Sequence, residues 1–250
     1  MGQWIDIPVA DGRSGFRGYL ATPSKGKGPG AVIVQEVFGV NQHIREVADK
    51  YAEEGFVALA PDIFWRVNSA ALGEIDAFWA PAVPPPVELG FEAADLAKGR
   101  AFVEKMDLDL TIKDIGDAAA VLRARPESTG KVGVVGFCLG GRLAFLAAAR
   151  NHPDAVAAYY GNIKDNLDEA GAIQCPIVIH FGADDPMSPP AMCEAVRAAL
   201  ANHREAEVYV YPGAGHAFNN WARATHYHPA AAALAHSRTL ATLRKGLGTR

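Results

Sequence analysis

The sequence predicts an α/β protein in which helices cover both faces of a mostly parallel sheet. Short apolar runs rich in β-formers alternate along the chain with longer segments of helical spacing, the pattern of strand–helix–strand units. The chain has 250 residues, of which 50% are hydrophobic and 21% charged, so it can bury a sizeable core without disulfides or metals. It contains no repeat, low-complexity tract or linker, and we expect a single domain over residues 1–250.

The chain is expected to begin with an antiparallel hairpin. Trp4–Val9 and Phe16–Thr22 have strand composition and flank a turn-forming Asp-Gly pair. The apolar run Gly30–Gln35 then predicts a buried strand, followed by a helix over Gln42–Glu54 for which Asn41 is the expected N-cap.

A long irregular excursion follows the next strand, Phe56–Ala60. It covers residues 62–108 and contains three consecutive prolines, which break regular structure. Because so long a connection is rarely structureless in a compact domain, we expect short helices near Ala70–Trp79 and Phe91–Lys105 that wall a pocket. Apolar residues at helical spacing then predict a helix over Leu110–Arg125.

The second half of the chain continues the alternation of strands and helices. The expected strands are Lys131–Phe137, Ala155–Tyr160, Pro176–Phe181 and Glu207–Tyr211, and the expected helices are Leu139–Arg150, Pro190–Asn202 and Pro229–Lys245.

Composition and charge exclude several classes of function. The net charge is −4 and no Lys/Arg-rich run appears, which argues against a nucleic-acid partner. No apolar stretch is long enough to span a bilayer, and the first residues lack the features of a secretory signal. Three cysteines without C-x-x-C spacing, Cys138, Cys175 and Cys193, fit a reducing compartment. We therefore expect a cytoplasmic protein without membrane or nucleic-acid partners.

The junction of strand Lys131–Phe137 with the following helix carries the most informative motif. Gly136 and Gly140 flank Cys138 at a spacing that allows a sharp strand-to-helix turn. A cysteine on such a turn is held out of the sheet at the positive end of a helix, and the N–H of Leu139 faces a developing oxyanion. The alternative is a small buried core cysteine whose neighbouring glycines only allow close packing.

Two later loops supply the partners that a nucleophilic cysteine needs. Asp184 and Asp185 follow the strand Pro176–Phe181, and His216 follows the strand Glu207–Tyr211. Loops after parallel strands open on one edge of the sheet. Nucleophile, acid and histidine in this chain order are the arrangement of the α/β-hydrolases.

Several segments resemble those of the dienelactone hydrolase (carboxymethylenebutenolidase) family. They are Gln35–Asn41, Gly136–Gly141, Tyr159–Gly161 and Gly213–Phe218, and the likeness covers nearly the whole chain. The resemblance implies a single-domain α/β-hydrolase fold that acts on esters or lactones. It implies Cys138 as nucleophile, His216 as base and Asp185, rather than Asp184, as the carboxylate that orients the base.

The resemblance also implies roles for residues outside this triad. Glu36 would hold the resting thiol, and the backbone N–H groups of Leu139 and Val37 would form the oxyanion hole. Arg66 would grip a substrate carboxylate. Further candidate substrate contacts are Phe38, Tyr160 and Asn220.

One position departs from the family pattern. The best-known members carry a second carboxylate-binding arginine four residues after the catalytic histidine, where this chain has Asn220. Arg223 is the alternative cation for this space. The exact substrate therefore stays open.

A cysteine nucleophile favours one kind of ester. The conjugate acid of a thiolate has a pKa of ~8.5, whereas that of an alkoxide is about as weak an acid as water, with a pKa of ~15.7. A thiolate therefore leaves the tetrahedral intermediate more readily than an alkoxide. An enol ester or enol lactone releases a delocalised enolate, which competes with the thiolate. We therefore expect hydrolysis of an enol lactone or activated ester, with the anionic lactones of aromatic degradation as the substrates that the resemblance implies.

Two other functions remain open at this point. One is a broad carboxylesterase, and the other is a non-catalytic protein that uses Cys138 for redox sensing or ligand contact. No organic cofactor is expected, and the His226, His228 and His236 cluster lacks the carboxylates and spacing of a metal site. The partner is expected to be a small molecule, and the protein a monomer or small homo-oligomer.

Overall fold

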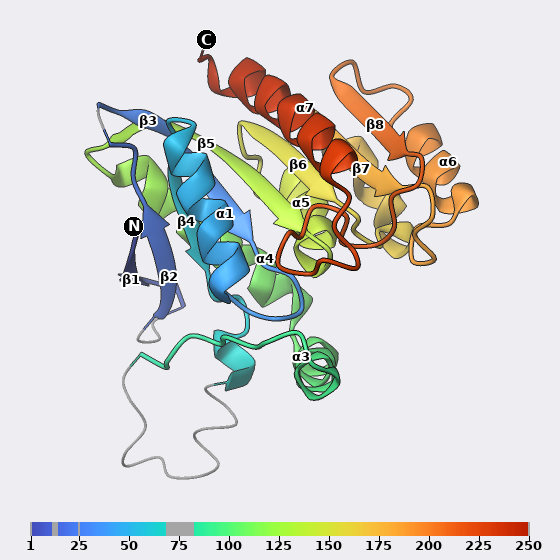
Figure 1. Cartoon of the computed structure of the whole chain (residues 1–250). Helices are drawn as coiled ribbons and strands as arrows, with labels where there is room; N and C mark the ends of the chain where they lie inside the picture. The colour runs from blue at the N-terminus through green and yellow to red at the C-terminus, as the bar shows by residue number, and fades with distance from the viewer. Residues whose placement is uncertain (1, 12–14, 25, 69–82, 250) are drawn as a thin grey trace. The chain divides into compact units, whose positions relative to one another are not determined.

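The structure of the chain is a computed structural model that describes residues 2–11, 15–24, 26–68 and 83–249 (Figure 1). The chain packs into two compact units, Met1–Gly130 and Lys131–Arg250. Each unit contains strands of the predicted kinds and the helices that cover them.

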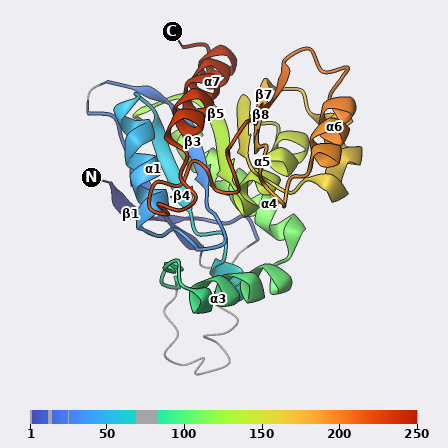
Figure 2. The same ribbon diagram turned by 45° about the vertical axis from the view of Figure 1, so that its right-hand side comes forward.

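The first unit is built around four strands (Figure 2). β1 pairs antiparallel with β2, β2 pairs antiparallel with β4, and β3 runs parallel to β4, so their order is β1-β2-β4-β3. The expected N-terminal antiparallel hairpin is therefore confirmed. The strand bounds are Gln3–Ile7 for β1, Phe16–Ala21 for β2, Gly28–Val34 for β3 and Val57–Pro61 for β4.

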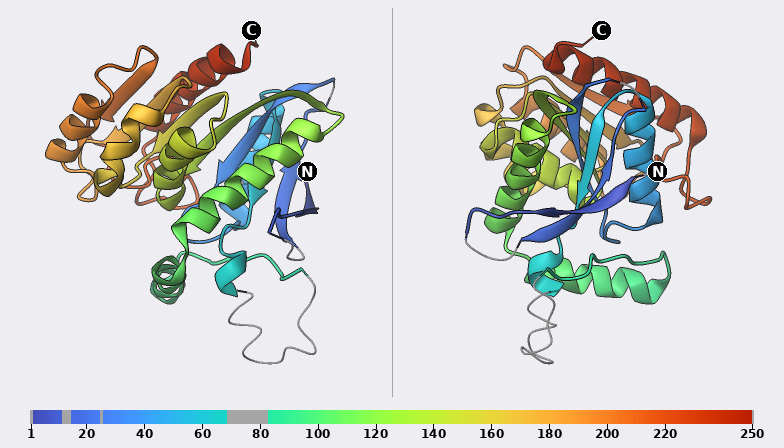
Figure 3. Two further views of the ribbon diagram at one scale, coloured as in Figure 1. Left: turned by 180° about the vertical axis from the view of Figure 1, so that it is seen from behind. Right: turned by 90° about the vertical axis from the view of Figure 1, so that its left-hand side faces the viewer.

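Helices α1 (Gln42–Glu53) and α4 (Leu108–Ala124) cover opposite faces of these strands (Figure 3). The side chain of Asn41 accepts a hydrogen bond from the N–H of Ile44 at 3.2 Å, which confirms the predicted cap of α1. Asp107 caps α4 in the same way, through the N–H of Leu110 at 2.9 Å. The apolar stripe predicted for α4 is buried against β3 and β4.

The excursion over residues 62–108 is partly described. Its second expected helix is present as α3 (Ala93–Lys105), which packs close to the end of β3: a Cβ added at Gly99 would lie 2.1 Å from the carbonyl oxygen of Val37. The first expected helix, Ala70–Trp79, lies outside the described residues. The side chain of Asp62 accepts hydrogen bonds from the N–H groups of Phe64 and Val87. It therefore links the segment just after β4 to the segment that precedes α3.

The second unit contains four parallel strands in the order β5-β6-β7-β8. Helix α7 packs on one face of the strands, and α5 packs on the other together with η1 and α6 (Figures 1 and 3). The strands are β5 (Ser128–Phe137, beginning in the first unit), β6 (Ala155–Tyr159), β7 (Ile177–Gly182) and β8 (Ala206–Tyr211), and the helices are α5 (Leu139–Arg150), η1 (Lys164–Ala172), α6 (Pro190–Ala199) and α7 (Pro229–Leu247).

Predicted and observed elements differ at a few places. Strand β5 starts three residues before the predicted Lys131, because Ser128–Gly130 continue its extended backbone. The 3-10 helix η1 was expected as loop, since its sequence has no apolar stripe of helical period. None of the helices among the described residues is long and apolar enough to cross a bilayer.

Candidate functional site

Cys138 occupies a strained turn between β5 and α5. Its backbone dihedrals are φ 54° and ψ −113°, a region that L-residues rarely adopt. Gly136 makes the turn possible, since a Cβ there would lie 1.8 Å from the carbonyl oxygen of Gly140. The N–H of Cys138 donates to the carbonyl of Tyr159 at 3.0 Å, which ties the turn to β6. The cysteine side chain is half-buried, so it is not the fully buried core residue that was the alternative.

The strands β7 and β8 deliver an acid and a histidine to Cys138. Nε2 of His216 lies 3.1 Å from Sγ of Cys138, and Nδ1 of His216 lies 2.8 Å from Oδ2 of Asp185. The other carboxylate oxygen of Asp185 accepts the N–H of Met187 at 2.8 Å. The side chain bonded to His216 belongs to Asp185, whereas that of Asp184 is exposed, and the orienting role of Asp185 remains a prediction.

The electrostatics of this triad favour a protonated imidazole. Burial lowers the pKa of His216, but its hydrogen bonds to Asp185 and Cys138 and their negative charges outweigh burial, and the pKa rises to about 10. The carboxylate of Asp185 is fully buried, so its charge is poorly screened. The protonated imidazole places its positive charge 3.1 Å from Sγ of Cys138.

Leu139 is the first residue of α5. Its N–H belongs to the first four amides of the helix, which have no carbonyl partner within the helix. Such amides at the positive end of a helix stabilise a negative oxygen. The position fits the oxyanion role that the sequence predicts for Leu139, and that role remains a prediction.

Tyr160 packs against His216. Its ring centroid lies 5.2 Å from that of His216, with the rings at 65°, and 5.4 Å from that of Phe218. The side chain is fully buried and its backbone has a positive φ of 39°. Tyr160 is thus held against His216 within the packed interior, and its predicted contact with substrate stays a prediction.

Asn220 shapes the loop that follows His216. It is fully buried, its side-chain oxygen accepts the N–H of Ala222 at 3.1 Å, and its carbonyl accepts the N–H of Arg223 at 3.1 Å. Asn220 therefore has a local structural role, whereas its predicted contact with substrate remains a prediction.

The same loop holds a cation, Arg223, that contacts His226. Nη2 of Arg223 lies 3.0 Å from Nε2 of His226. Burial first, and then the charges of Arg223 and His216, lower the pKa of His226. His226 therefore lies close enough to His216 to sense its charge, and the sequence indicates Arg223 and His226 separately but not as a pair.

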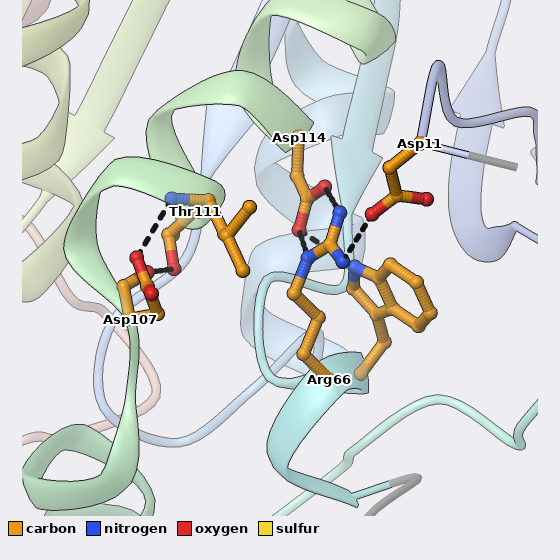
Figure 4. Close-up of polar contacts among 7 residues, drawn as sticks. Asp11, Arg66, Asp107, Thr111 and Asp114 are labelled. Carbon is orange, nitrogen blue, oxygen red and sulfur yellow. Dashed lines mark hydrogen bonds and ion pairs between the residues drawn. The ribbon is translucent and has the colours of Figure 1, made fainter. Parts of the chain in front are cut away.

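Arg66, predicted to grip a substrate carboxylate, is engaged with carboxylates of the protein itself (Figure 4). Its Nε and Nη2 contact the two oxygens of Asp114 at 2.8 and 2.6 Å, and its Nη1 contacts Asp11 at 2.7 Å. The indole N–H of Trp65 donates to Asp114 at 2.7 Å. Sequence analysis missed Asp114 as a partner, although an aspartate inside the apolar stripe of α4 signals a buried ion pair.

The remaining predicted residues lie in the first unit, just after β3. Glu36 is 2% exposed, and Phe38 is buried with its ring centroid 5.0 Å from that of Phe91. Both amide atoms of the neighbouring Gln35 are buried and lack a hydrogen-bond partner in the described part of the chain. The roles of Glu36, Val37 and Phe38 toward Cys138 remain predictions. Among the described residues there is no group of three or more His, Cys, Asp or Glu that could hold a metal ion.

A cysteine on a strand-to-helix turn that meets a histidine and an acid at the ends of parallel strands is the arrangement of the α/β-hydrolases. A model of the dienelactone hydrolase family matches residues 16–247, and the chain belongs to that family. It is a hydrolase of the dienelactone hydrolase kind, and the family match runs through both units.

Relatives and solved structures agree with this assignment. The chain is 36% identical over 250 residues to a provisionally named carboxymethylenebutenolidase of Azospirillum brasilense, with 98% of this chain and 99% of the relative covered. It is 31% identical to the carboxymethylenebutenolidase of Pseudomonas putida, with 94% and 93% covered. A provisionally named dienelactone hydrolase of Klebsiella pneumoniae superposes with a TM-score of 0.80 at 29% identity, covering 98% of both chains. The predicted α/β-hydrolase fold is therefore confirmed.

Proposed function

We propose that the protein hydrolyses an enol lactone or activated ester through Cys138 and a thioester acyl-enzyme. The observation that carries this proposal is the pair of distances at His216, 3.1 Å to Sγ of Cys138 and 2.8 Å to Oδ2 of Asp185. They match the hydrogen-bonded nucleophile, base and orienting acid that covalent ester hydrolysis needs.

The first half of the proposed reaction forms the thioester. The Cys138 thiolate attacks the carbonyl carbon, and the negative carbonyl oxygen is stabilised by the N–H of Leu139 together with that of Val37. When this intermediate collapses, the ring C–O bond breaks and the electron pair leaves as an enolate. The enolate then takes up the proton of the His216 imidazolium, which leaves the imidazole neutral, and the acyl group remains on the sulfur.

The second half releases the product. His216 takes a proton from water, whose oxygen attacks the thioester carbonyl and displaces the Cys138 thiolate. Asp185 holds the imidazole with Nε2 toward the sulfur during both halves. The reaction adds one water and yields a carboxylate and, after the enol rearranges, a ketone.

The preference for an enolate leaving group follows from the nucleophile. A thiolate, whose conjugate acid has a pKa of ~8.5, is expelled in preference to an alkoxide, whose conjugate acid has a pKa of about 15.7. The tetrahedral intermediates of simple alkyl esters would therefore mostly revert to ester and thiolate. An activated ester such as p-nitrophenyl acetate avoids this reversal because its phenolate also leaves readily. The proposal therefore predicts turnover of enol lactones and aryl esters, and little turnover of ethyl esters.

An anionic substrate is part of the proposal. Arg223, paired with His226 beside His216, supports it, because a cation near the triad attracts a carboxylate-bearing lactone. The charge of Arg66 is met by Asp114 and Asp11, so Arg66 would bind substrate only by sharing or exchanging these partners. Glu36 keeps the role that the family resemblance implies, and Phe38, Tyr160 and Asn220 stay candidate substrate contacts. A place in aromatic degradation and a cytoplasmic location, both expected from sequence and resemblance, belong to the same proposal.

The test compares wild type with Cys138→Ala on a carboxylate-bearing enol lactone and on p-nitrophenyl acetate. We expect wild type to turn over both, and Cys138→Ala to lose at least about 10³-fold in kcat. Equal turnover by the two proteins would refute the cysteine mechanism. If wild type hydrolyses neither compound while peroxide readily modifies Cys138, the redox-sensing alternative gains and the hydrolase proposal fails.

A second comparison separates a lactonase for anionic substrates from a broad carboxylesterase. Arg223→Gln removes the charge of the pair beside His216. It should raise KM for the anionic lactone about tenfold and leave KM for neutral p-nitrophenyl acetate within about twofold. Wild type with no preference for the anionic compound would point to the broad esterase.

A further inference from the structure

Five polar side chains of the second unit form a continuous hydrogen-bonded series from its surface to β6. In order they are Arg238, Tyr211, His180, Thr239 and Tyr159, here called the polar series. Nδ1 of His180 lies 2.9 Å from Oη of Tyr211, and Nε2 lies 2.9 Å from Oγ1 of Thr239. Oγ1 of Thr239 lies 2.6 Å from Oη of Tyr159. Arg238 hydrogen-bonds Tyr211 and its guanidinium lies 3.7 Å from the ring centroid of Tyr209.

The interior of the polar series is dry. His180 and Thr239 are fully buried, and Tyr159 and Tyr211 are 1% and 3% exposed. Burial, and after it the charge of Arg238, lower the pKa of His180 to about 3, so its imidazole is neutral and has one N–H. A neutral imidazole between two hydroxyls must donate on one side and accept on the other.

The guanidinium of Arg238 gives this arrangement a direction. It can only donate, so the Tyr211 oxygen accepts from it and the Tyr211 O–H is available to His180 Nδ1. The N–H at Nε2 then donates to Thr239, and the Thr239 O–H donates to Tyr159. His180 and Thr239 each donate and accept within the series, so removing the Thr239 hydroxyl takes a hydrogen-bond partner from the buried His180.

Two members of the polar series also hold the catalytic turn through their main chains. The carbonyl of Tyr159 accepts the N–H of Cys138 at 3.0 Å, and the carbonyl of His180 accepts the N–H of Tyr160 at 2.7 Å. Tyr160 in turn packs its ring against His216. Thr239 therefore joins the side chains of His180 and Tyr159. The carbonyls of these same two residues bind the strained backbones of Tyr160 and Cys138.

The strain at these sites makes such support necessary. Cys138 and Tyr160 both have positive φ, 54° and 39°, which persists in a non-glycine residue only when its surroundings impose it. A small relaxation of β6 or β7 would move Sγ of Cys138 relative to Nε2 of His216. Catalytic hydrogen bonds are sensitive to such shifts.

We propose that Thr239, with His180 and Tyr159, is a positioning residue that keeps the Cys138 and His216 side chains in reactive register from the opposite face of the sheet. This inference rests on the proposed function of Cys138. Its residues touch neither substrate nor the reacting atoms, and it assigns to α7 a part in the chemistry beyond covering the sheet.

The test uses Thr239→Val, which keeps the shape of the side chain and removes its hydroxyl, and Thr239→Ser, which keeps the hydroxyl. Thr242→Val is the matched control, since Thr242 is a buried threonine of α7 outside the polar series. Each protein is assayed for kcat and KM on p-nitrophenyl acetate, for unfolding by urea, and for alkylation of Cys138 by iodoacetamide between pH 5 and 9, followed by peptide mass spectrometry.

We expect Thr239→Val to lose about tenfold in kcat with KM within about twofold, and its Cys138 alkylation below pH 7 to slow by a similar factor. Thr239→Ser should restore both readouts. Thr242→Val should retain wild-type kcat and alkylation. If Thr239→Val does not fold, Tyr159→Phe removes only the terminal hydroxyl and should show the same two losses.

The inference is overturned if folded Thr239→Val, or Tyr159→Phe in its place, keeps the kcat and the alkylation profile of wild type. It is also overturned if Thr242→Val loses as much kcat and alkylation rate as Thr239→Val. Failure of the proposed function gives a different result. In that event wild type itself shows no turnover that depends on Cys138.

Discussion

Asp114 receives the guanidinium of Arg66 through two hydrogen bonds, from Nε at 2.8 Å and from Nη2 at 2.6 Å. The same carboxylate accepts the indole N–H of Trp65. Burial raises the pKa of Asp114, while the hydrogen bonds from Arg66 and Trp65 act in the opposite direction. The arginine that resemblance assigns to substrate is therefore also part of the structure that joins α4 to the segment after β4.

Removing Asp114 should destabilise the protein strongly. Asp114→Ala leaves the N–H groups of Trp65 and Arg66 without their acceptor, and we expect the free energy of unfolding to fall by about 3–5 kcal/mol. Asp109→Ala, an exposed acid in the first turn of the same helix, should cost less than about 1 kcal/mol. Urea denaturation of the two variants checks this, and equal losses would contradict a buried role for Asp114.

This ion pair also changes how an Arg66 variant must be assayed. Arg66→Ala leaves the buried carboxylate of Asp114 without its cation, so a loss of activity has a structural component. Activity on anionic and neutral substrates has to be compared without denaturant and at a temperature well below Tm. A selective loss on the anionic lactone would then assign Arg66 to substrate binding, and equal losses on both would assign it to structure.

The raised pKa of His216 predicts how the thiol responds to pH. With a pKa of about 10, the imidazole stays protonated from pH 6 to 9 and keeps a positive charge 3.1 Å from Sγ of Cys138 over this range. Alkylation of Cys138 in wild type should therefore remain fast at pH 6. His216→Asn should slow it about tenfold or more there, because the sulfur loses the imidazolium that lies 3.1 Å from it. Identical profiles of the two proteins would show that His216 does not support the thiolate.

Asp62 predicts a pH dependence of stability with a defined sign. Burial raises its pKa from 3.8 to about 7, against the hydrogen bonds from Val87 and Phe64. Since the folded pKa exceeds the unfolded one, the contribution of Asp62 is fully present below pH 3.8 and is lost as pH rises through 7. The free energy of unfolding of wild type, measured relative to Asp62→Asn, should fall between pH 4 and 8. A difference that stays constant over this range would contradict the raised pKa.

Backbone strain next to His216 predicts a trade between stability and activity. Ala217 and His152 both have positive φ, 61° and 49°, and glycine adopts this region freely. Either substitution, Ala217→Gly or His152→Gly, should add up to about 1 kcal/mol to the free energy of unfolding. Only Ala217→Gly should lower kcat, by several-fold, because it loosens the loop that carries His216. A loss of kcat in His152→Gly as well would contradict the prediction that only the backbone strain next to His216 supports activity.

Much of the fold could be predicted from local patterns. Asn41 as the cap of α1, the antiparallel hairpin of β1 and β2, and the bounds of α5 at Leu139 and Arg150 follow from residues close together in the chain. Such features depend on propensity, capping and periodicity, which act over a few residues. The 3-10 helix η1 could not be predicted in this way, because it has neither a regular stripe nor a side-chain cap.

The candidate site divides along the same line. Gly136, Cys138 and Gly140 define the strand-to-helix turn within five residues, and chain order alone indicates an acid and a histidine as partners of the cysteine. Three contacts join residues that lie far apart in the chain. His216 and Asp185 are 31 positions apart, Arg66 and Asp114 are 48 apart, and His180 and Thr239 are 59 apart. No local pattern contains these distances.

The amino-acid sequence by itself determined the class of fold, the turn that presents Cys138 and the order of the triad, because each depends on short-range backbone preferences. Only the tertiary structure decided which carboxylate meets His216, which acids neutralise Arg66 and which hydroxyls surround His180. These contacts form when strands and helices pack, and burial then makes the charge and hydrogen bonding of each partner count.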